Sequence, residues 1–352
     1  MEAIIGWDVG GVHLKAARCE NGRIVSVIQL ASPLRTGLGR LAQAFEEAAA
    51  RLGKADRHVV TMTGELADTF ASRAEGVERL TGLVGEKLAG ENVSLYAGRA
   101  GLVPPAAARA HLADIASANW HASAALVAKR YTSALFIDMG STTTDIIPVR
   151  NGRIAARGYT DAERLAAGEL VYTGLVRAFV MAVADRAPFA GTWTKLVNEN
   201  FATMADVHRI LGTLAEETDQ MPTADGREKT VAASRARLAR MVGRDAADGD
   251  DGAWRSLAQW LAEAQMRAVI DGAMLVTSAG GLAPQAPVVA AGIAKPVVSE
   301  IAHRLGQPCV TFETLLEVLP EARAAASRCA PAAALALLLA LDSTSQTPRT
   351  DA

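Results

Sequence analysis

Apolar and polar positions alternate in blocks along the chain, and the first blocks predict strands. "AIIGWDVGG" at 3–11 and "ALFIDMGS" at 134–141 are apolar runs, each carrying aspartate, one further residue and glycine near its end. A second apolar stretch follows each run and leads into Asn-Gly, the dipeptide that favours a tight turn between two strands. The pattern therefore predicts two similar units of strand, loop, strand, turn and strand.

These two units form an internal repeat. Residues 7–24 align with residues 137–154 without a gap, and both copies contain the tetrapeptide "NGRI". Asp8 aligns with Asp138 in the same register. A single short match is a common coincidence, whereas two matches in one register indicate a duplicated supersecondary unit. We therefore expect two lobes that face each other across a shared cleft.

The segments after each unit alternate between helical and strand patterns. Between 36 and 53, apolar residues recur at three- and four-residue spacing after the capping candidate Thr36, which predicts an amphipathic helix. The sequences "HVVTMTGEL" (58–66) and "VSLYAG" (93–98) predict strands followed by helices. Such alternation is typical of an α/β lobe with a mostly parallel sheet.

The second half is predicted to repeat this arrangement with an insertion. We expect a helical insertion from about 160 to 272, followed by strand-turn-helix units at 275–282 and 287–306. At 352 residues the chain exceeds the roughly 250–300 residues at which one core stops growing. The predicted domains are a first lobe at 1–130, joined by a C-terminal helix at 322–352, and a second lobe at 131–321.

Composition excludes several kinds of partner and location. The formal net charge of −2 gives no attraction to nucleic acid, so we expect small-molecule substrates and no nucleic-acid partner. The apolar stretch at 330–341 is shorter than the roughly 20 residues that span a membrane, which predicts a buried helix. The N-terminus has no signal-peptide pattern. Three scattered cysteines (Cys19, Cys309 and Cys329) fit a reduced, cytoplasmic protein without structural zinc, and a homo-oligomer is left open.

The two loops have the composition of a phosphate-binding site. Glycine lets backbone N–H groups converge on an anion, and hydroxyls add donors. The predicted donors are Gly10, Gly11 and His13 in the first loop and Gly140, Ser141, Thr142 and Thr143 in the second. We expect Asp8, Asp138 and Asp145 to hold Mg²⁺ through water, while Lys15 neutralises phosphate charge. The alternative is that both loops are ordinary hairpin turns, where these residue types are common.

The loops also carry a resemblance to known proteins. "DVGGVHLK" and "DMGSTTTD" resemble the two phosphate loops of the acetate and sugar kinase, heat-shock chaperone and actin superfamily. Within it, "DMGSTTTDI" is similar to the hydantoinase and oxoprolinase family. The segments closest to its branch for tetrahydromethanopterin-linked one-carbon transfer are "SANWHASA" (117–124), "GELVYTG" (168–174), "NENFATMADVHRILG" (198–212), "TADGREKT" (223–230) and "RARLARMVGRD" (235–245). The resemblance implies an α/β, two-lobed actin/sugar-kinase-like fold with duplicated ribonuclease H-like lobes.

The resemblance also implies a reaction in methanofuran-type cofactor synthesis. An aminomethyl-furanylmethyl diphosphate is condensed with the phenol of tyramine or its γ-glutamyl derivative, and diphosphate leaves. The loops, Mg²⁺ and Lys15 would stabilise the charge that grows on the diphosphate. The alternatives are an ATP-dependent hydrolase of the oxoprolinase kind or a small-molecule kinase, and a nucleotide-sensing module without catalysis.

The reaction of the phenol requires a base and a binding site for the acceptor. An unperturbed phenol has a pKa of about 10, so ether formation needs a base. The candidates for it are Glu169, Asp206, His208 and Asp225, each with an ordinary surface charge or cap as the alternative. Weaker substrate-binding candidates are Asn119, Trp120, Asp225 and Arg240, where a core tryptophan and a solvated arginine face are the alternatives.

Three glycines bear on whether the protein binds ATP. The superfamily usually places a glycine pair against adenosine, and Ala290-Ala291-Gly292 departs from that pair. Gly280-Gly281 would supply the pair or simply permit a tight turn. ATP is therefore not favoured, although it is not excluded.

Overall fold

The computed structural model describes residues 2–345, which form two compact units. The first unit contains the described residues up to 136, the segment 149–155 and the residues from 310 onward. The second contains residues 137–148 and 156–309. The sequence prediction placed residues 131–321 in the second lobe, whereas 131–136, 149–155 and 310–321 belong to the first unit.

The first unit is built on a six-stranded sheet in the order β3-β2-β1-β4-β5-β6. Its strands are β1 (Ala3–Val9), β2 (His13–Glu20), β3 (Arg23–Ala31), β4 (Arg57–Met62), β5 (Val93–Tyr96) and β6 (Leu102–Val103). β4 pairs parallel to β1, and β5 pairs parallel to β4. Asn21 and Gly22 between β2 and β3 have φ of 51° and 75°, the positive pair that a type I′ turn requires. The predicted hairpin is confirmed.

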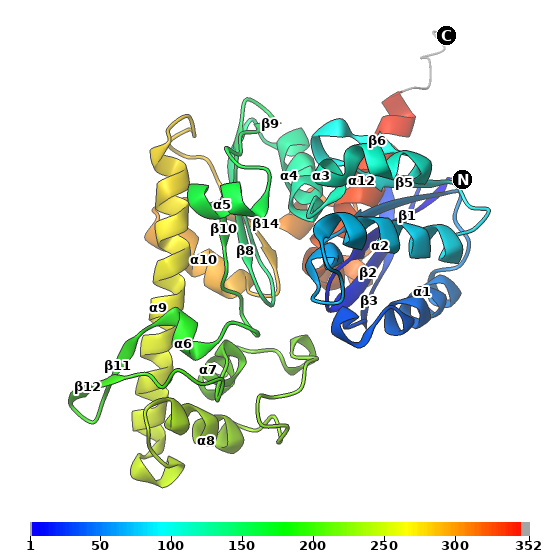
Figure 1. Cartoon of the computed structure of the whole chain (residues 1–352). Helices are drawn as coiled ribbons and strands as arrows, with labels where there is room; N and C mark the ends of the chain where they lie inside the picture. Colours follow the sequence, from blue (N-terminus) through cyan, green and yellow to red (C-terminus); the bar gives the residue numbers. More distant parts are fainter. Residues whose placement is uncertain (1, 346–352) are drawn as a thin grey trace. The chain divides into compact units, whose positions relative to one another are not determined.

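Helices cover both faces of this sheet (Figure 1). The helices of the first unit are α1 (Gly39–Leu52), α2 (Arg73–Lys87), α3 (Leu112–Ile115), α4 (Asn119–Arg130), α11 (Arg323–Arg328) and α12 (Ala330–Ser345). α1 buries the predicted apolar stripe, including Leu41, Phe45 and Leu52. The predicted cap is wrong, because Thr36 ends a 3-10 turn in which its hydroxyl donates to the Pro33 carbonyl (2.7 Å).

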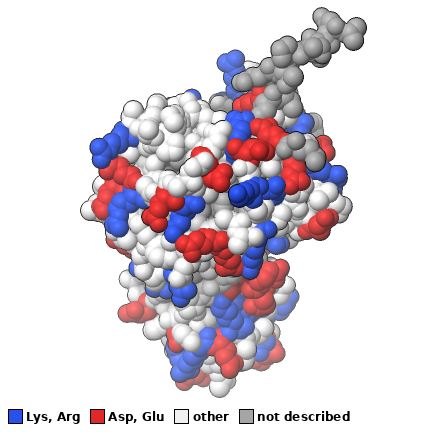
Figure 2. Space-filling view, turned by 90° about the vertical axis from the view of Figure 1, so that its right-hand side faces the viewer, with Lys and Arg blue, Asp and Glu red and all other residues white. Residues whose placement is uncertain are grey.

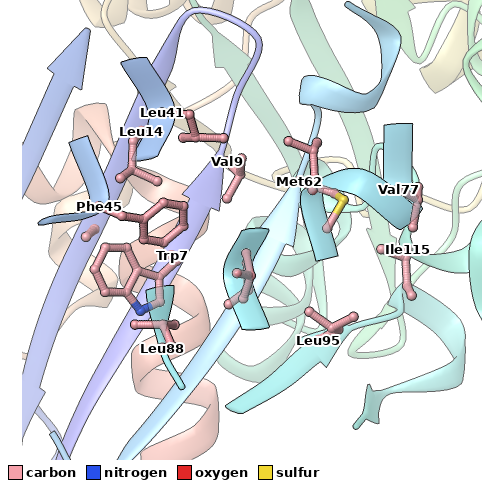
Figure 3. Close-up of a cluster of buried hydrophobic side chains, with 14 of the residues drawn as sticks. Trp7, Val9, Leu14, Leu41, Phe45, Met62, Val77, Leu88, Leu95 and Ile115 are labelled. Atoms are coloured by element: carbon pink, nitrogen blue, oxygen red, sulfur yellow. The ribbon is translucent and has the colours of Figure 1, made fainter. Parts of the chain in front are cut away.

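Neighbouring residues of β1 pack against helices on opposite faces, as the pleat requires. Trp7 lies against Phe45 of α1 with ring centroids 5.0 Å apart, and Figure 3 shows both rings in the core cluster. The Trp7 indole N–H donates to His58 Nδ1 (3.0 Å). A Cβ on Gly6 would lie 2.1 Å from the Ala332 carbonyl oxygen, so α12 packs directly on the backbone of β1.

The predicted buried helix at 330–341 is confirmed as α12, while residues 346–352 of the predicted C-terminal helix lie outside the described residues. Within residues 2–345 no single helix has the length and apolarity to cross a membrane. One pair, Pro320–Arg328 and Ala330–Asp342, meets that test only jointly and is bent by 114°.

The second sheet has the order β10-β8-β7-β13-β14, with β9 beside β8. Its strands are β7 (Ser133–Met139), β8 (Thr144–Arg150), β9 (Arg153–Ile154), β10 (Leu170–Val171), β13 (Val288–Gly292) and β14 (Cys309–Thr311). Asn151 and Gly152, with φ of 51° and 66°, reproduce the turn of the first sheet. The repeat found in the sequence is therefore also a repeat of structure.

The predicted insertion consists mainly of helices, and it also contains a two-stranded hairpin (Figure 1). The helices of the second unit are α5 (Asp161–Ala167), α6 (Val180–Val183), α7 (Met204–Leu211), α8 (Val231–Met241), α9 (Asp251–Ser278) and α10 (Lys295–Arg304). The hairpin of β11 (Arg186–Phe189) and β12 (Thr192–Lys195) was not predicted.

The predicted strand near 275 is wrong. α9 continues to Ser278, because buried Val269, Ile270, Ala273 and Val276 maintain the helical period. The strand-turn-helix unit predicted at 287–306 is confirmed by β13 and α10.

Candidate functional site

The two glycine loops have the same internal geometry. In the first, Gly10 N–H donates to the His13 carbonyl at 3.0 Å, and in the second, Gly140 N–H donates to the Thr143 carbonyl at 2.9 Å. Each bond closes the loop between two antiparallel strands, directly after the aspartate-containing strand end. The duplicated sequence thus makes a duplicated loop.

Carbonyl groups of both loops are turned toward the body of their own unit. Gly11 O accepts from Leu34 N–H (2.9 Å), while Gly140 O and Ser141 O accept from Leu175 and Arg177 N–H (3.0 and 2.8 Å). In a trans peptide the N–H points opposite to the preceding C=O. The N–H groups of Val12, Ser141 and Thr142 therefore point away from these segments, the orientation that anion binding by a loop needs.

A carboxylate and an ammonium group lie at the base of the first loop. Asp8 is 2% exposed, and Lys15 stands opposite it in the β1–β2 register. Lys15 Nζ lies 3.5 Å from Asp8 Oδ2. His13 is half-buried at the start of β2, opposite Ala31. The structure thus brings together the residues predicted for this loop.

The second loop has an aspartate in place of the lysine, and an arginine pairs with it. Arg164 Nη2 of α5 lies 2.5 Å from Asp145 Oδ1, and Arg164 is 2% exposed. Asp138 is half-buried. At the end of β13, Gly292 has φ of 84°, and a Cβ there would lie 2.5 Å from Asp138 Oδ1. Close packing against Asp138 therefore accounts for Gly292 without a nucleotide.

The predicted nucleotide glycines lie in a separate turn. Gly280 and Gly281 directly follow α9 and have φ of 78° and 84°, which only glycine adopts readily. A Cβ on Gly280 would meet no atom within 4 Å. A tight turn explains both residues, and a role in nucleotide binding stays a prediction.

A chain of hydrogen bonds links the inserted helices to the second loop. His208 Nε2 of α7 bonds to Gln265 Oε1 of α9 (2.9 Å), and the Gln265 amide donates to the Gly174 carbonyl (2.8 Å). Gly174 packs on the loop, since a Cβ there would lie 2.5 Å from Thr142 N. Burial lowers the pKa of His208 and keeps it neutral. The geometry makes His208 a support of the loop.

Glu169 has both carboxylate oxygens engaged by backbone. It is fully buried, and it accepts from Arg157 N–H at Oε1 (2.6 Å) and from Gly158 N–H at Oε2 (2.9 Å). These bonds fix the turn between β9 and α5. Glu169, which the sequence suggested as a base, therefore holds the backbone of this turn in place.

Asp206 and Asp225 belong to one buried ion-pair network. Asp206 Oδ1 accepts from Arg237 Nε (2.9 Å) and from the Ser234 hydroxyl (2.7 Å), while Oδ2 caps α7 at Thr203 N–H (3.1 Å). Arg237 is fully buried and also pairs with Asp225 Oδ1 (3.2 Å). Arg240, a predicted substrate-binding candidate, is exposed on α8, whereas Arg237 of the same helix is buried. The network joins α7, α8 and the segment before α8.

Sequence reasoning passed over a polar group at the carboxyl ends of β4 and β5. Glu65 is 1% exposed and accepts from the Ser117 hydroxyl at 2.6 Å. The Tyr96 hydroxyl bonds to His121 Nδ1 at 2.8 Å. Asn119 Oδ1 accepts from Trp120 N–H (2.7 Å) within α4, and Trp120 is 3% exposed. The available signal was a carboxylate just after a predicted parallel strand, where ligands of α/β sheets bind.

His121 predicts a dependence of stability on pH. Burial, aided by the charge of Arg99, lowers its pKa from 6.5 to about 4. The neutral ring is favoured in the fold, so its stabilisation is complete above pH 6.5 and is lost as pH falls toward 4. We expect a loss on the order of 3 kcal/mol at most over that window.

Urea unfolding at pH 7.5, 6, 5 and 4.5 measures this dependence. His121→Gln cannot titrate and should make the curve shallower, with buried His58 and His208 accounting for a remaining slope, whereas His303→Gln on exposed α10 should leave the curve unchanged. If the unfolding free energy of wild type and of His121→Gln changes equally with pH, the His121 ring does not cause the pH dependence.

The donor set of the loops fits a magnesium ion that arrives with phosphate. Within residues 2–345, no three His, Cys, Asp or Glu side chains form a group able to hold a metal. Lys15 pairs with Asp8 and Arg164 pairs with Asp145, while Asp138 is half-buried beside Gly292. Mg²⁺ commonly binds one or two carboxylates together with substrate phosphates and water.

Two surface features lie apart from the loop residues. A surface pocket of about 640 Å³ is lined by Trp260, Glu263, Arg267, Met274 and Arg304 of α9 and α10, and none of these is a predicted site residue. Figure 2 shows basic and acidic side chains interspersed over the face that it draws. The expectation of no nucleic-acid partner stays a prediction.

Comparisons with known proteins place most of the chain in the hydantoinase/oxoprolinase family. The sequence model of the hydantoinase/oxoprolinase family matches residues 56–338. A (4-{4-[2-(gamma-L-glutamylamino)ethyl]phenoxymethyl}furan-2-yl)methanamine synthase of Methanocaldococcus jannaschii is 32% identical over 246 residues, covering 69% of this chain and 72% of the relative. The protein of the same name from Methanococcus vannielii is 34% identical over 113 residues, 32% of this chain and 50% of that relative.

A solved structure shows the same fold. The nucleotide-free structure of acetone carboxylase aligns with a TM-score of 0.57 at 12% identity, over 94% of this chain and 70% of that chain. The predicted α/β, actin/sugar-kinase-like fold class is confirmed, and the strand, loop, strand and turn of the first sheet recur in the second sheet.

Proposed function

Because the chain belongs to the hydantoinase/oxoprolinase family, we propose that it is a furan-methanamine synthase of methanofuran-type cofactor synthesis. The observation that carries the proposal is the 32% identity to the synthase of Methanocaldococcus jannaschii over 69% of this chain. The family resemblance of the two loops, noted from the sequence, supports the same assignment.

The product named for that relative indicates the reaction. It contains a phenoxymethyl group, an ether between the phenol of glutamyl-tyramine and a methylene carbon on furan. Forming that ether needs a phenol oxygen as nucleophile and a furanylmethyl carbon that carries a leaving group. The furan ring delocalises positive charge at this carbon, so the carbon–oxygen bond to the leaving group breaks readily. We propose an (aminomethyl)furanylmethyl diphosphate as donor, and tyramine or γ-glutamyl-tyramine as acceptor.

The loops supply what a departing diphosphate needs. Negative charge grows on its oxygens as the bond to carbon breaks, and donors fixed in advance stabilise such charge most effectively. In the first unit the outward N–H group of Val12 and the ammonium group of Lys15 are such donors, and the loop of the second unit offers the outward N–H group of Thr142. Mg²⁺, held through water by Asp138, would neutralise further charge on the diphosphate.

The test is an assay without nucleotide. The full-length protein, Mg²⁺, the furanylmethyl diphosphate and γ-glutamyl-tyramine should give the aryl ether and one equivalent of diphosphate, measured by mass spectrometry and a coupled diphosphate assay. No ether with either phenolic amine would reject the proposal. Phosphate release from ATP stimulated by a lactam or amide would favour the oxoprolinase-like alternative instead.

A further inference from the structure

We propose that Arg177 binds the diphosphate group of the donor at the second glycine loop, an inference that rests on the proposed function. Arg177 lies in the segment between β10 and α6, three residues after the motif "GELVYTG", and sequence reasoning assigned it no role. Its backbone is bonded to the loop and its side chain is exposed. These two facts together make it a candidate for binding an anion there.

The segment 173–178 packs on the loop, backbone against backbone. A Cβ on Gly174 would lie 2.5 Å from Thr142 N, so only glycine permits this approach. Three residues further on, Arg177 N–H donates to the Ser141 carbonyl at 2.8 Å. The Thr142 N–H belongs to the same peptide group as that carbonyl and points the opposite way. Arg177 therefore starts one peptide group away from an N–H that is turned outward.

Hydrogen bonds on both sides hold the backbone of Arg177 in place. The Val176 carbonyl accepts from Ala205 N–H (3.1 Å), and the Ala178 carbonyl accepts from Met204 N–H (2.8 Å), both in the first turn of α7. The position of Arg177 relative to the loop is thus fixed before any ligand arrives. A residue fixed in this way loses less freedom on binding than one in a mobile segment.

The guanidinium group of Arg177 is available for a ligand. Arg177 is exposed, although Val176 and Ala178 on either side of it are buried. Among the residues that the structure describes, its side chain forms no ion pair or hydrogen bond. Arg164, by contrast, is buried and pairs with Asp145. An anion can therefore bind to Arg177 without breaking a bond that stabilises the fold.

The duplicated loop of the second unit has use for such a cation. In the first unit Lys15 places an ammonium group beside the loop, whereas Asp145 occupies the aligned position of the second unit. The outward N–H groups of this loop supply partial charges only. A diphosphate carries several full negative charges, so a guanidinium group from the adjoining segment would complement them.

Arginine also has the right shape for this task. Its planar fork makes two parallel N–H···O bonds with phosphate oxygens, and its long side chain can pass the edge of the Ser141–Thr142 peptide group to reach an anion on the N–H side. Negative charge grows on the diphosphate as the bond to the furanylmethyl carbon breaks. We therefore expect Arg177 to stabilise the departing diphosphate as well as the bound donor.

Binding of inorganic diphosphate to the full chain tests the inference without turnover. In titration calorimetry with Mg²⁺ present, Arg177→Ala should weaken the affinity by about 10- to 100-fold. Arg177→Lys keeps the charge without the fork and should recover part of that loss. Arg255→Ala removes another exposed arginine, on α9 of the same unit, and should bind like wild type. Urea midpoints should stay close to wild type in all three, because both side chains are exposed.

Steady-state kinetics provide a second measurement that a merely structural role would not reproduce. With the furanylmethyl diphosphate as donor, Arg177→Ala should raise the KM for the donor and leave the KM for γ-glutamyl-tyramine unchanged. A distorted loop or a partly unfolded unit would instead lower the fraction of active protein, which reduces kcat and leaves both KM values as they were.

The outcomes separate the inference from the proposed function. If Arg177→Ala binds diphosphate within threefold of wild type, or if Arg255→Ala loses as much affinity, the inference is withdrawn. It is also withdrawn if wild type does not bind diphosphate. If wild type binds diphosphate through Arg177 but forms no ether with either phenolic amine, the anion site stands and the proposed function is rejected.

Discussion

Asp138→Ala is expected to lower ether formation by about 10³-fold while the urea midpoint of unfolding stays close to wild type. Asp138 is the carboxylate proposed to hold Mg²⁺ through water beside the second loop. It is half-buried, so its removal uncovers little apolar surface. Steady-state turnover at saturating Mg²⁺ measures the effect, and Asp138→Asn separates the loss of charge from the loss of volume.

Two other aspartates serve as comparisons for Asp138. Asp145→Ala removes the partner of buried Arg164 and should therefore lower stability as well as turnover. Asp271→Ala changes an exposed residue of α9 that pairs with Arg267, and should leave both stability and turnover unchanged. Normal turnover in Asp138→Ala would remove Asp138 from the metal site.

Asp206→Ala is expected to cost about 3 kcal/mol of unfolding free energy, a large part of the roughly 5–15 kcal/mol that stabilises a typical domain. The fully buried guanidinium of Arg237 loses its closest carboxylate, and Thr203 N–H loses its cap. The contact of Arg237 with Asp225 remains and limits the loss. Urea unfolding followed by tryptophan fluorescence measures the change, because Trp254 lies in the core next to these helices.

Second-site changes check the reason for this loss. Adding Arg237→Met to Asp206→Ala removes the unpaired charge and should restore part of the stability. Arg240→Ala on the same helix is exposed and should stay within about 0.5 kcal/mol of wild type. A loss in Arg240→Ala as large as that in Asp206→Ala would contradict the network as its cause.

The repeated hairpins were predictable because their signals are local. Asn-Gly sets the two positive φ angles by itself, and the period of α1 shows directly in the spacing of its apolar residues. The end of α9 was not predictable in the same way. Gly280-Gly281 marks a turn, but the preceding apolar run fits a strand as well as a helix, and packing decided between them.

The support of the site was harder to predict than the loops themselves. The loops are continuous in sequence, whereas the pair of Glu65 and Ser117 joins residues 52 positions apart. Asp206 and Arg237 meet across 31 positions, and nothing near Asp206 in the sequence distinguishes a buried ion pair from a base. Residues that act through distant partners therefore need the fold before a role can be assigned.

The packing of α12 on β1 sets the order in which the first unit can be completed. During synthesis β1 is made well before α12, the helix that covers one of its faces. The second unit, made in between, has all of its segments available earlier. The nascent first sheet must therefore keep an apolar face uncovered until α12 has been made, which exposes that face to chaperones and to aggregation.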